Sequence, residues 1–146
     1  LDGHHTLRAL LESTAAEKTA YGRIRANWSD LAPDEFWARM RANGYVNLTA
    51  PDGGGPLPPA QLPASLRAMA RDPYRGLAWA VMHRTGFAER KDVLYLEFLW
   101  ADFFRRHLAW DDNDDDAFDD AATAAMVLAR SPAAAHLPGY TPALRP

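Results

Sequence analysis

The chain has 146 residues and a mass of 16.2 kDa, which is the size of about one domain. A hydrophobic content of 48% and an aromatic content of 11% exclude an intrinsically disordered protein. Because the sequence has no cysteine, a disulfide scaffold, a thiolate zinc site and a cysteine nucleophile are excluded. The 16 Lys and Arg against 19 Asp and Glu give a net charge of −3, which disfavours a surface for broad capture of nucleic acid.

No apolar run reaches the length of about 18 residues that a membrane span needs, and no signal-peptide pattern opens the chain. The sequence therefore predicts a soluble protein without a membrane partner, and it does not indicate the compartment. The chain begins at Leu1-Asp2-Gly3 without an initiator Met. We interpret Leu1 as the last residue of a strand and expect these residues to belong to a longer chain.

Apolar residues recur at helical spacing along most of the chain, and capping residues mark the starts of several helices. Asp2 is the expected N-cap of the first helix, and Asp72-Pro73 combines an N-cap with Pro at the first helical position. A helix is also predicted to start within residues 30–35 and to end at Asn43-Gly44. The other predicted helices cover residues 4–15, 62–69, 73–82, 93–108 and 114–129.

Two segments predict short strands. Residues 21–28 alternate weakly, which places Ile24, Ala26 and Trp28 on an inward side, and residues 45–48 predict a second strand or extended piece. Residues 51–61 are a loop by composition, since Gly and Pro dominate them. We therefore predict an α+β fold that is mostly α-helical, with a small N-terminal sheet before this loop and a helical bundle after it.

The first candidate for chemistry is the segment from Asp2 to Arg8. A helix N-terminus offers backbone N–H groups and the positive end of the helix dipole, and Gly3 allows a ligand to approach the backbone closely. His4, His5, Thr6 and Arg8 add donors or cations, so this pattern is typical of a phosphate site. The alternative is a capped helix with two surface histidines. A divalent metal is the weakest interpretation, because adjacent histidines diverge by about 100° on a helix.

The stretch Leu1-Asp2-Gly3-His4-His5-Thr6-Leu7-Arg8-Ala9-Leu10 resembles the signature of the putative ParB-like nucleases, a family of the ParB/sulfiredoxin superfamily. Further segments are similar to the same family and extend the resemblance over nearly the whole chain. They are Asp34-Glu35-Phe36-Trp37, Leu62-Pro63, Asp72-Pro73-Tyr74-Arg75-Gly76-Leu77-Ala78-Trp79, Glu97-Phe98-Leu99-Trp100-Ala101-Asp102-Phe103 and Leu137-Pro138-Gly139-Tyr140.

The resemblance implies a ParB/sulfiredoxin-like core that lacks its first strands in this chain. Residues 1–50 would be the C-terminal part of this phosphate-binding core, residues 51–61 the Gly/Pro loop, and residues 62–146 a helical part packed on it as one compact unit. The implied ligand is a small phosphorylated molecule or a nucleotide (ATP, ADP or CTP), with Mg²⁺ possible as a companion ion. The kinase branch of the superfamily has Asp-Gly-His-His followed by Arg, whereas Thr6 stands at that place here and Arg8-Ala9 could supply the Arg-Ala of the ParB-type box.

By this resemblance we assign cofactor binding to the motif and catalysis to its two histidines. The expected cofactor-binding residues are Asp2, Gly3, His4, His5, Thr6 and Arg8, and the expected catalytic residues are His4 and His5; no metal-ligating residue is expected. The implied activity is that of a nuclease or of a nucleotide-dependent phosphotransferase. Two alternatives stay open, namely a non-catalytic helical interaction domain and a DNA-partitioning-type binding module, and the net charge disfavours the second.

Further candidates lie in the predicted helices. Glu97 and Asp102 could be a general base or metal ligands, but ion pairs with Arg75, Arg84 or Arg106 are the favoured interpretation. Asp72-Pro73-Tyr74-Arg75 is better explained as a helix start than as a site. The acidic run from residue 111 to residue 120 lacks the Gly and Glu of a calcium-binding hand, and it predicts a solvated loop and a helix N-terminus. The isolated residues His83, His107 and His136 are expected at the surface.

Overall fold

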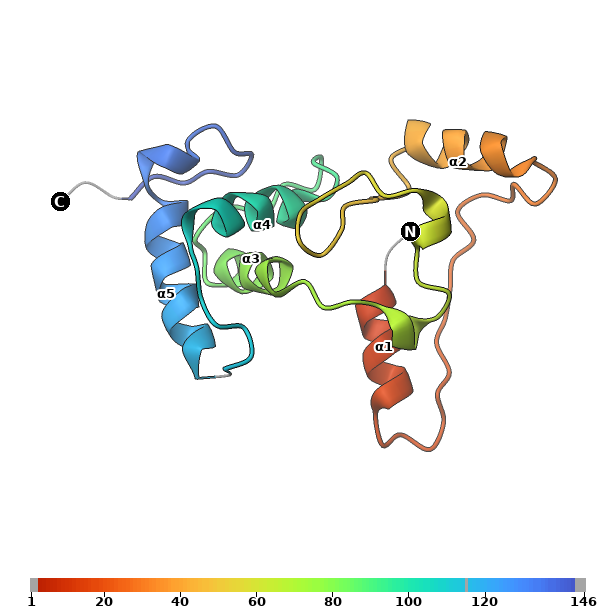
Figure 1. Cartoon of the computed structure of the whole chain (residues 1–146), viewed down its shortest axis with the longest axis horizontal. Coiled ribbons are helices and arrows are strands. Elements are labelled where there is room, and N and C mark those ends of the chain that lie inside the picture. Colours follow the sequence, from red (N-terminus) through yellow and green to blue (C-terminus); the bar gives the residue numbers. More distant parts are fainter. Residues whose placement is uncertain (1–2, 115, 144–146) are drawn as a thin grey trace. The chain divides into compact units, whose positions relative to one another are not determined.

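The computed structural model describes residues 3–114 and 116–143, and the regular elements in this part of the chain are helices joined by long irregular segments (Figure 1). It contains the five α-helices α1 (His4–Glu12), α2 (Pro33–Ala42), α3 (Pro73–His83), α4 (Leu96–His107) and α5 (Ala117–Ala129). The described residues also contain three single-turn 3₁₀ helices: η1 (Pro59–Gln61) and η2 (Leu66–Ala68) lie between α2 and α3, and η3 (Pro132–Ala134) follows α5. No described helix is both long enough and apolar enough to cross a lipid bilayer.

The predicted small N-terminal sheet is wrong, and with it the α+β fold class, because the described residues contain no strand. Residues 13–27 are all exposed, so the alternation at 21–28 faces solvent instead of a neighbouring strand. Around the second predicted strand, the hydrogen bonds from Leu57 N to Leu48 O (2.8 Å) and from Ala50 N to Gly54 O (2.7 Å) close a turn. A strand is stable only in a ladder of several such bonds, so these segments stay irregular.

The helix predicted over residues 62–69 is also wrong, since only η1 and η2 form in this part of the chain. Pro63 lies between them, and proline in a helix interior removes a backbone donor and clashes with the preceding turn. Ser65 begins η2 instead, and its hydroxyl accepts a hydrogen bond from Ala68 N at 3.3 Å. The other five predicted helices are present, with ends that differ by a few residues.

The described residues form two compact units. Unit 1 comprises residues 3–50 and 54–70, with α1, α2, η1 and η2. Its buried side chains are few: Met40 of α2 and Leu48 are the buried apolar residues. Trp28, Phe36 and Tyr45 add a half-buried aromatic cluster, in which Trp28 stacks on Tyr45 at 5.8 Å and meets Phe36 edge-on at 6.4 Å. Unit 1 is therefore held by aromatic contacts around α2 more than by a large core.

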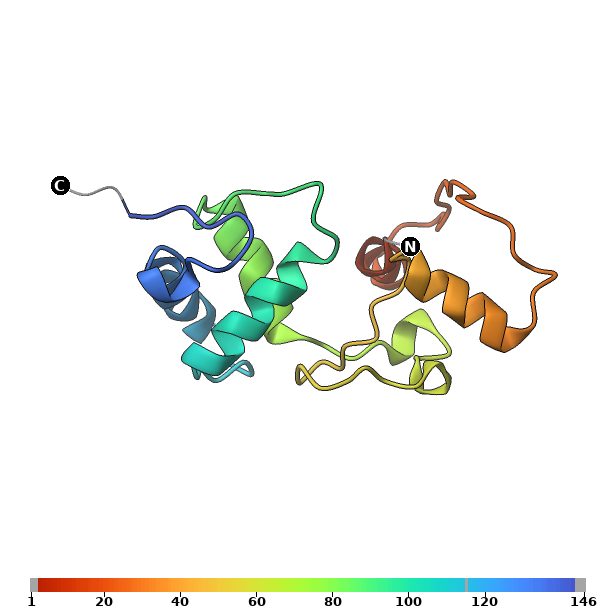
Figure 2. The same ribbon diagram turned by 90° about the horizontal axis from the view of Figure 1, so that it is seen from above.

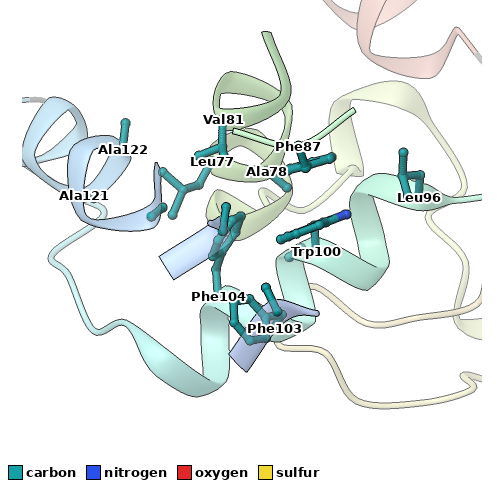
Figure 3. Packing of buried hydrophobic residues seen from close by; sticks show 14 residues of the cluster. Leu77, Ala78, Val81, Phe87, Leu96, Trp100, Phe103, Phe104, Ala121 and Ala122 are labelled. Atoms are coloured by element: carbon teal, nitrogen blue, oxygen red, sulfur yellow. The ribbon is translucent and has the colours of Figure 1, made fainter. Parts of the chain in front are cut away.

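Unit 2 comprises residues 51–53, 71–114 and 116–143, and α3, α4 and α5 enclose its core. Helices α3 and α4 lie side by side and α5 packs across them (Figure 2). Trp100, Phe103 and Phe104 of α4 are fully buried, and Phe104 extends toward α3 (Figure 3). Phe87 stacks on Trp100 with ring centroids 4.0 Å apart. Each large side chain buried in this way contributes about 1.5–3 kcal/mol, so the aromatic face of α4 dominates the stability of unit 2.

The start of α3 confirms a prediction made from the sequence. Asp72 has an extended backbone, its Oδ1 accepts a hydrogen bond from Arg75 N at 3.0 Å, and Pro73 occupies the first helical position. Proline costs nothing there, because the N–H that it lacks would have no acceptor within the helix. The predicted packing of the two parts of the chain into one unit stays a prediction.

Candidate functional site

The motif predicted to bind phosphate lies at the start of α1. Gly3 is the N-cap of this helix, with φ at 96° and ψ at 1°, and its carbonyl accepts the hydrogen bond from Leu7 N at 2.9 Å. A residue with a side chain would be strained at this positive φ, so glycine suits the position. Asp2, the predicted N-cap, lies outside the described residues. Within the described part of the chain, the N-cap of α1 is the Gly3 backbone, which has no side chain to contribute.

His4, His5 and Thr6 form the first turn of α1, and all three side chains are exposed. Consecutive residues are separated by about 100° around a helix, so the three side chains spread around the N-terminal end. The positive end of the helix dipole lies at the same turn. The first turn therefore presents two imidazoles and a hydroxyl to solvent where a helix favours an anion.

Arg8 connects α1 with η2 inside unit 1. Its Nε is 2.6 Å from Glu12 Oε1, and its Nη1 donates to the carbonyls of Leu66 at 2.8 Å and Arg67 at 3.1 Å. The Arg8 side chain keeps an exposed fraction of 30%. A phosphate that bound this guanidinium would compete with the carboxylate of Glu12. Arg8 therefore already has a structural role within unit 1, in addition to the ligand-binding role predicted for it.

The acidic residues of α4 lie in ion pairs, as the sequence interpretation favoured. Glu97 Oε2 is 2.8 Å from Arg75 Nη2, and both side chains are less than a quarter exposed, at 22% and 23%. Asp102 Oδ2 is 3.1 Å from Arg106 Nη2, one helical turn away. The other predicted partner of Glu97, Arg84, instead pairs with an aspartate of α5 at 2.7 Å. The Glu97 pair therefore links α3 and α4 and the Asp102 pair lies within α4, and both contacts support a structural role for these acids.

One polar cluster escaped the sequence interpretation. Arg105 Nη2 donates to Asp72 Oδ1 at 3.0 Å and to the Pro51 carbonyl at 3.1 Å, while its guanidinium carbon lies 5.1 Å from the ring centroid of Tyr74. The side chains of Arg105 and Asp72 are only 17% and 12% exposed. Asp72 was predicted as an N-cap. Its ion pair with Arg105 could not be predicted, because the two residues are 33 positions apart in the sequence and do not share a helix.

The remaining histidines lie at the surface, as predicted. Two of them contact a backbone carbonyl oxygen of their own helix. His83 Nδ1 lies 2.9 Å from Trp79 O, and His107 Nδ1 lies 2.8 Å from Phe103 O. His136 is exposed on the segment after η3.

The acidic run leads into α5, which begins at Ala117 and has Asp119 and Asp120 in its first turn. One residue of this run, at position 115, lies outside the described part of the chain. Across the residues that the structure describes, no three His, Asp or Glu side chains gather into a group that could hold a metal ion.

Comparisons with known proteins match the chain to a protein family and to solved structures. The family model described as putative ParB-like nuclease matches residues 1–106. The crystal structure of protein Atu1540 from Agrobacterium tumefaciens is 31% identical in sequence and superposes with a TM-score of 0.83. That match covers 99% of this chain and 72% of the Agrobacterium chain. The comparison with curated proteins found no match.

Proposed function

Because the chain belongs to the family of putative ParB-like nucleases, we propose that it binds the phosphate groups of a nucleotide at the N-terminus of α1. The activity proposed for this site is that of a ParB-like nuclease or of a nucleotide-dependent phosphotransferase. The expected ligands are ATP, ADP or CTP, with Mg²⁺ as a companion ion.

The observation that supports this proposal most directly is the first turn of α1. Gly3 caps the helix with its backbone in the left-handed region, and nothing lies within 4 Å of the position where a Cβ would stand. His4, His5 and Thr6 are exposed beside it. Phosphate oxygens accept hydrogen bonds from such groups, and the helix dipole favours their negative charge.

The proposed roles follow from the chemistry of each side chain. Imidazole groups change charge near neutral pH, so His4 and His5 would donate to phosphate oxygens and exchange a proton with the reacting group. Thr6 would add a hydroxyl donor. Arg8 would approach the phosphates with the part of its guanidinium that Glu12 does not occupy, and the carboxylate of Asp2 belongs to the same proposed set.

A non-catalytic binding domain is the second candidate, and the contacts of Arg8 favour it. The only arginine of the motif is already bound to Glu12 and to two carbonyls of the 66–67 segment. Thr6 also stands where the kinase branch has Arg. In this case the domain would bind a phosphorylated ligand or another protein without turning over a substrate.

Isothermal titration with ATP, ADP and CTP, each with and without Mg²⁺, tests the proposal. We expect one nucleotide to bind, and the double substitution His4→Ala and His5→Ala to weaken its binding at least tenfold. The control is His136→Ala, which removes an exposed imidazole from unit 2 and should leave the affinity unchanged.

Absence of binding by all three nucleotides would refute the phosphate site. An unchanged affinity in the double variant would refute its placement at α1. Binding without hydrolysis of a nucleotide, without phosphate transfer and without cleavage of an oligonucleotide would favour the non-catalytic candidate.

A further inference from the structure

The exposed side of α3 contains a glycine that unit 2 itself does not require. Gly76 lies within the helix and its φ is not positive, so its backbone conformation is one that any residue adopts. Apart from its own stretch of helix, no described residue comes within 4 Å of the position of an added Cβ. Glycine disfavours a helix more than any residue except proline. Neither the backbone nor the packing of unit 2 therefore explains this glycine.

A half-exposed tryptophan lies beside this gap. Trp79 follows Gly76 by three positions, so the two share a side of α3, and 50% of the Trp79 surface is exposed. The ring of His83, one turn further on, stacks on the indole with centroids 3.9 Å apart, and His83 Nδ1 lies 2.9 Å from Trp79 O. The indole is thus held in place while half of it faces solvent, and tryptophan is enriched among the residues that contribute most to protein interfaces. We call Gly76, Trp79 and His83 the α3 face.

The outer side of α5 has matching properties. Asp120, Thr123 and Val127 are exposed at the same i, i+3 and i+7 spacing, and we call them the α5 face. The exposed fraction of Val127 is 71%. Valine has one strongly preferred χ1 rotamer in a helix, so this apolar side chain projects from α5 in a fixed direction. The α5 face therefore offers a small, stiff apolar side chain of the kind that a gap over a glycine can accept.

The two faces also lie in segments of opposite charge. Residues 73–86 have two arginines, one histidine and no acidic residue, whereas residues 111–129 have seven aspartates and no Lys or Arg. Inside unit 2 these segments already attract each other, because Arg84 Nη2 is 2.7 Å from Asp119 Oδ1. The α3 segment of one copy and the α5 segment of another are therefore complementary, whereas two α3 segments or two α5 segments would bring like charges together.

We propose that the α3 face of one copy of this chain binds the α5 face of a second copy. In an antiparallel arrangement, the equal spacing of the two faces places Val127 over the gap at Gly76. It also places the Asp120 carboxylate beside His83, where a carboxylate stabilises the protonated imidazole. A parallel arrangement would instead put the carboxylate at the apolar gap, so the antiparallel one is favoured. Because the contact joins two different faces, one copy supplies α3 and the other supplies α5.

Sedimentation velocity of the whole chain over a range of concentrations at low salt tests this proposal, which does not depend on the phosphate site at α1. Two helices of 11 and 13 residues make a small interface, so we expect reversible association, with an average mass that rises above 16.2 kDa as the concentration increases.

Three substitutions on the two faces should weaken this association. Trp79→Ala and Val127→Lys should each weaken it at least tenfold. Gly76→Ala, which favours the helix but fills the gap, should weaken it at least threefold. The matched control is Leu94→Ala, which removes an exposed apolar side chain of unit 2 outside both faces and should change the association less than twofold.

A mixture of the Trp79→Ala and Val127→Lys variants identifies the two faces directly. The first variant keeps the α5 face and the second keeps the α3 face, so the mixture should form a one-to-one complex at a concentration where neither variant associates alone. Gly76→Ala remains informative where Trp79→Ala disturbs the fold, because alanine stabilises the helix of the single chain.

Three results would overturn the proposal. The first is the mass of a single chain up to millimolar concentration. The second is an equal loss of association in Leu94→Ala and Gly76→Ala. The third is a mixture that stays monomeric although both variants give the helical circular dichroism of the wild type.

Discussion

Asp72 takes part in two stabilising interactions, the N-cap of α3 and an ion pair with Arg105, and two substitutions distinguish their contributions. Its Oδ1 accepts hydrogen bonds from Arg75 N and from Arg105 Nη2, both at 3.0 Å. Asparagine caps helices about as well as aspartate, so Asp72→Asn keeps the cap and removes only the charge. Asp72→Ala removes both interactions and leaves Arg105 with the more distant carboxylate of Asp102, whose Oδ1 is 3.7 Å from Arg105 Nη1.

The structure sets the expected magnitudes. Loss of an N-cap costs about 1 kcal/mol. Breaking a fully buried ion pair costs about 3–5 kcal/mol, but these side chains are 12% and 17% exposed and Arg105 keeps the Pro51 carbonyl, so the cost here is smaller. We expect Asp72→Asn to lower the free energy of unfolding by about 1–2 kcal/mol, and Asp72→Ala by about 3 kcal/mol.

Urea unfolding at neutral pH, followed by circular dichroism, measures both variants. The corresponding fall in melting temperature is about 2–4 °C per kcal/mol for a chain of this length. Asp30→Asn, a charge removal at an exposed position of unit 1, is the control and should change the stability little. If Asp72→Asn matched the wild type, the ion pair would contribute nothing; if it matched Asp72→Ala, the cap would contribute nothing.

Three further predictions concern the core, the backbone and the ion pairs of unit 2. Phe104→Ala should lower the free energy of unfolding by about 3–5 kcal/mol, because a fully buried ring is removed; a loss under about 1 kcal/mol in urea unfolding would contradict this packing. Gly139→Ala should lower the melting temperature, because the φ of Gly139 is 81° and an added Cβ would clash with the backbone carbonyl oxygen of Ala88. Gly76→Ala, on the open side of α3, should instead raise the free energy of unfolding by about 0.5–1 kcal/mol. Differential scanning calorimetry distinguishes the two, and a stable Gly139→Ala protein would argue against that close approach. Glu97→Gln should weaken the pair with Arg75 and lower stability by about 1 kcal/mol while nucleotide and oligonucleotide binding stay unchanged; a loss of binding with intact stability would make Glu97 a ligand-binding residue instead.

The helices of this protein are determined largely by local sequence. Asp72 and Pro73 mark the start of α3 because a cap and an early proline act on the residues next to them. The i,i+4 spacing of Asp102 and Arg106 predicted their ion pair for the same reason, since one turn of α-helix brings such residues together. The break between η1 and η2 was also present in the sequence, in the form of Pro63, and apolar spacing alone gave the wrong prediction there.

The absence of strands among the described residues and the polar contacts between distant segments were decided by the tertiary structure. The alternation at residues 21–28 is compatible with a strand, but a strand needs a partner that alternation cannot supply. Arg105 meets Asp72, and Arg8 meets the carbonyls near η2, across separations of 33 and 58 positions in the sequence. Trp28 and Tyr45 stack across an intervening helix in the same way. Such pairs are determined by how helices and loops pack against one another. Hydrophobic periodicity in the sequence predicts which face of a helix or strand is apolar, but it does not predict which distant residue will contact that face.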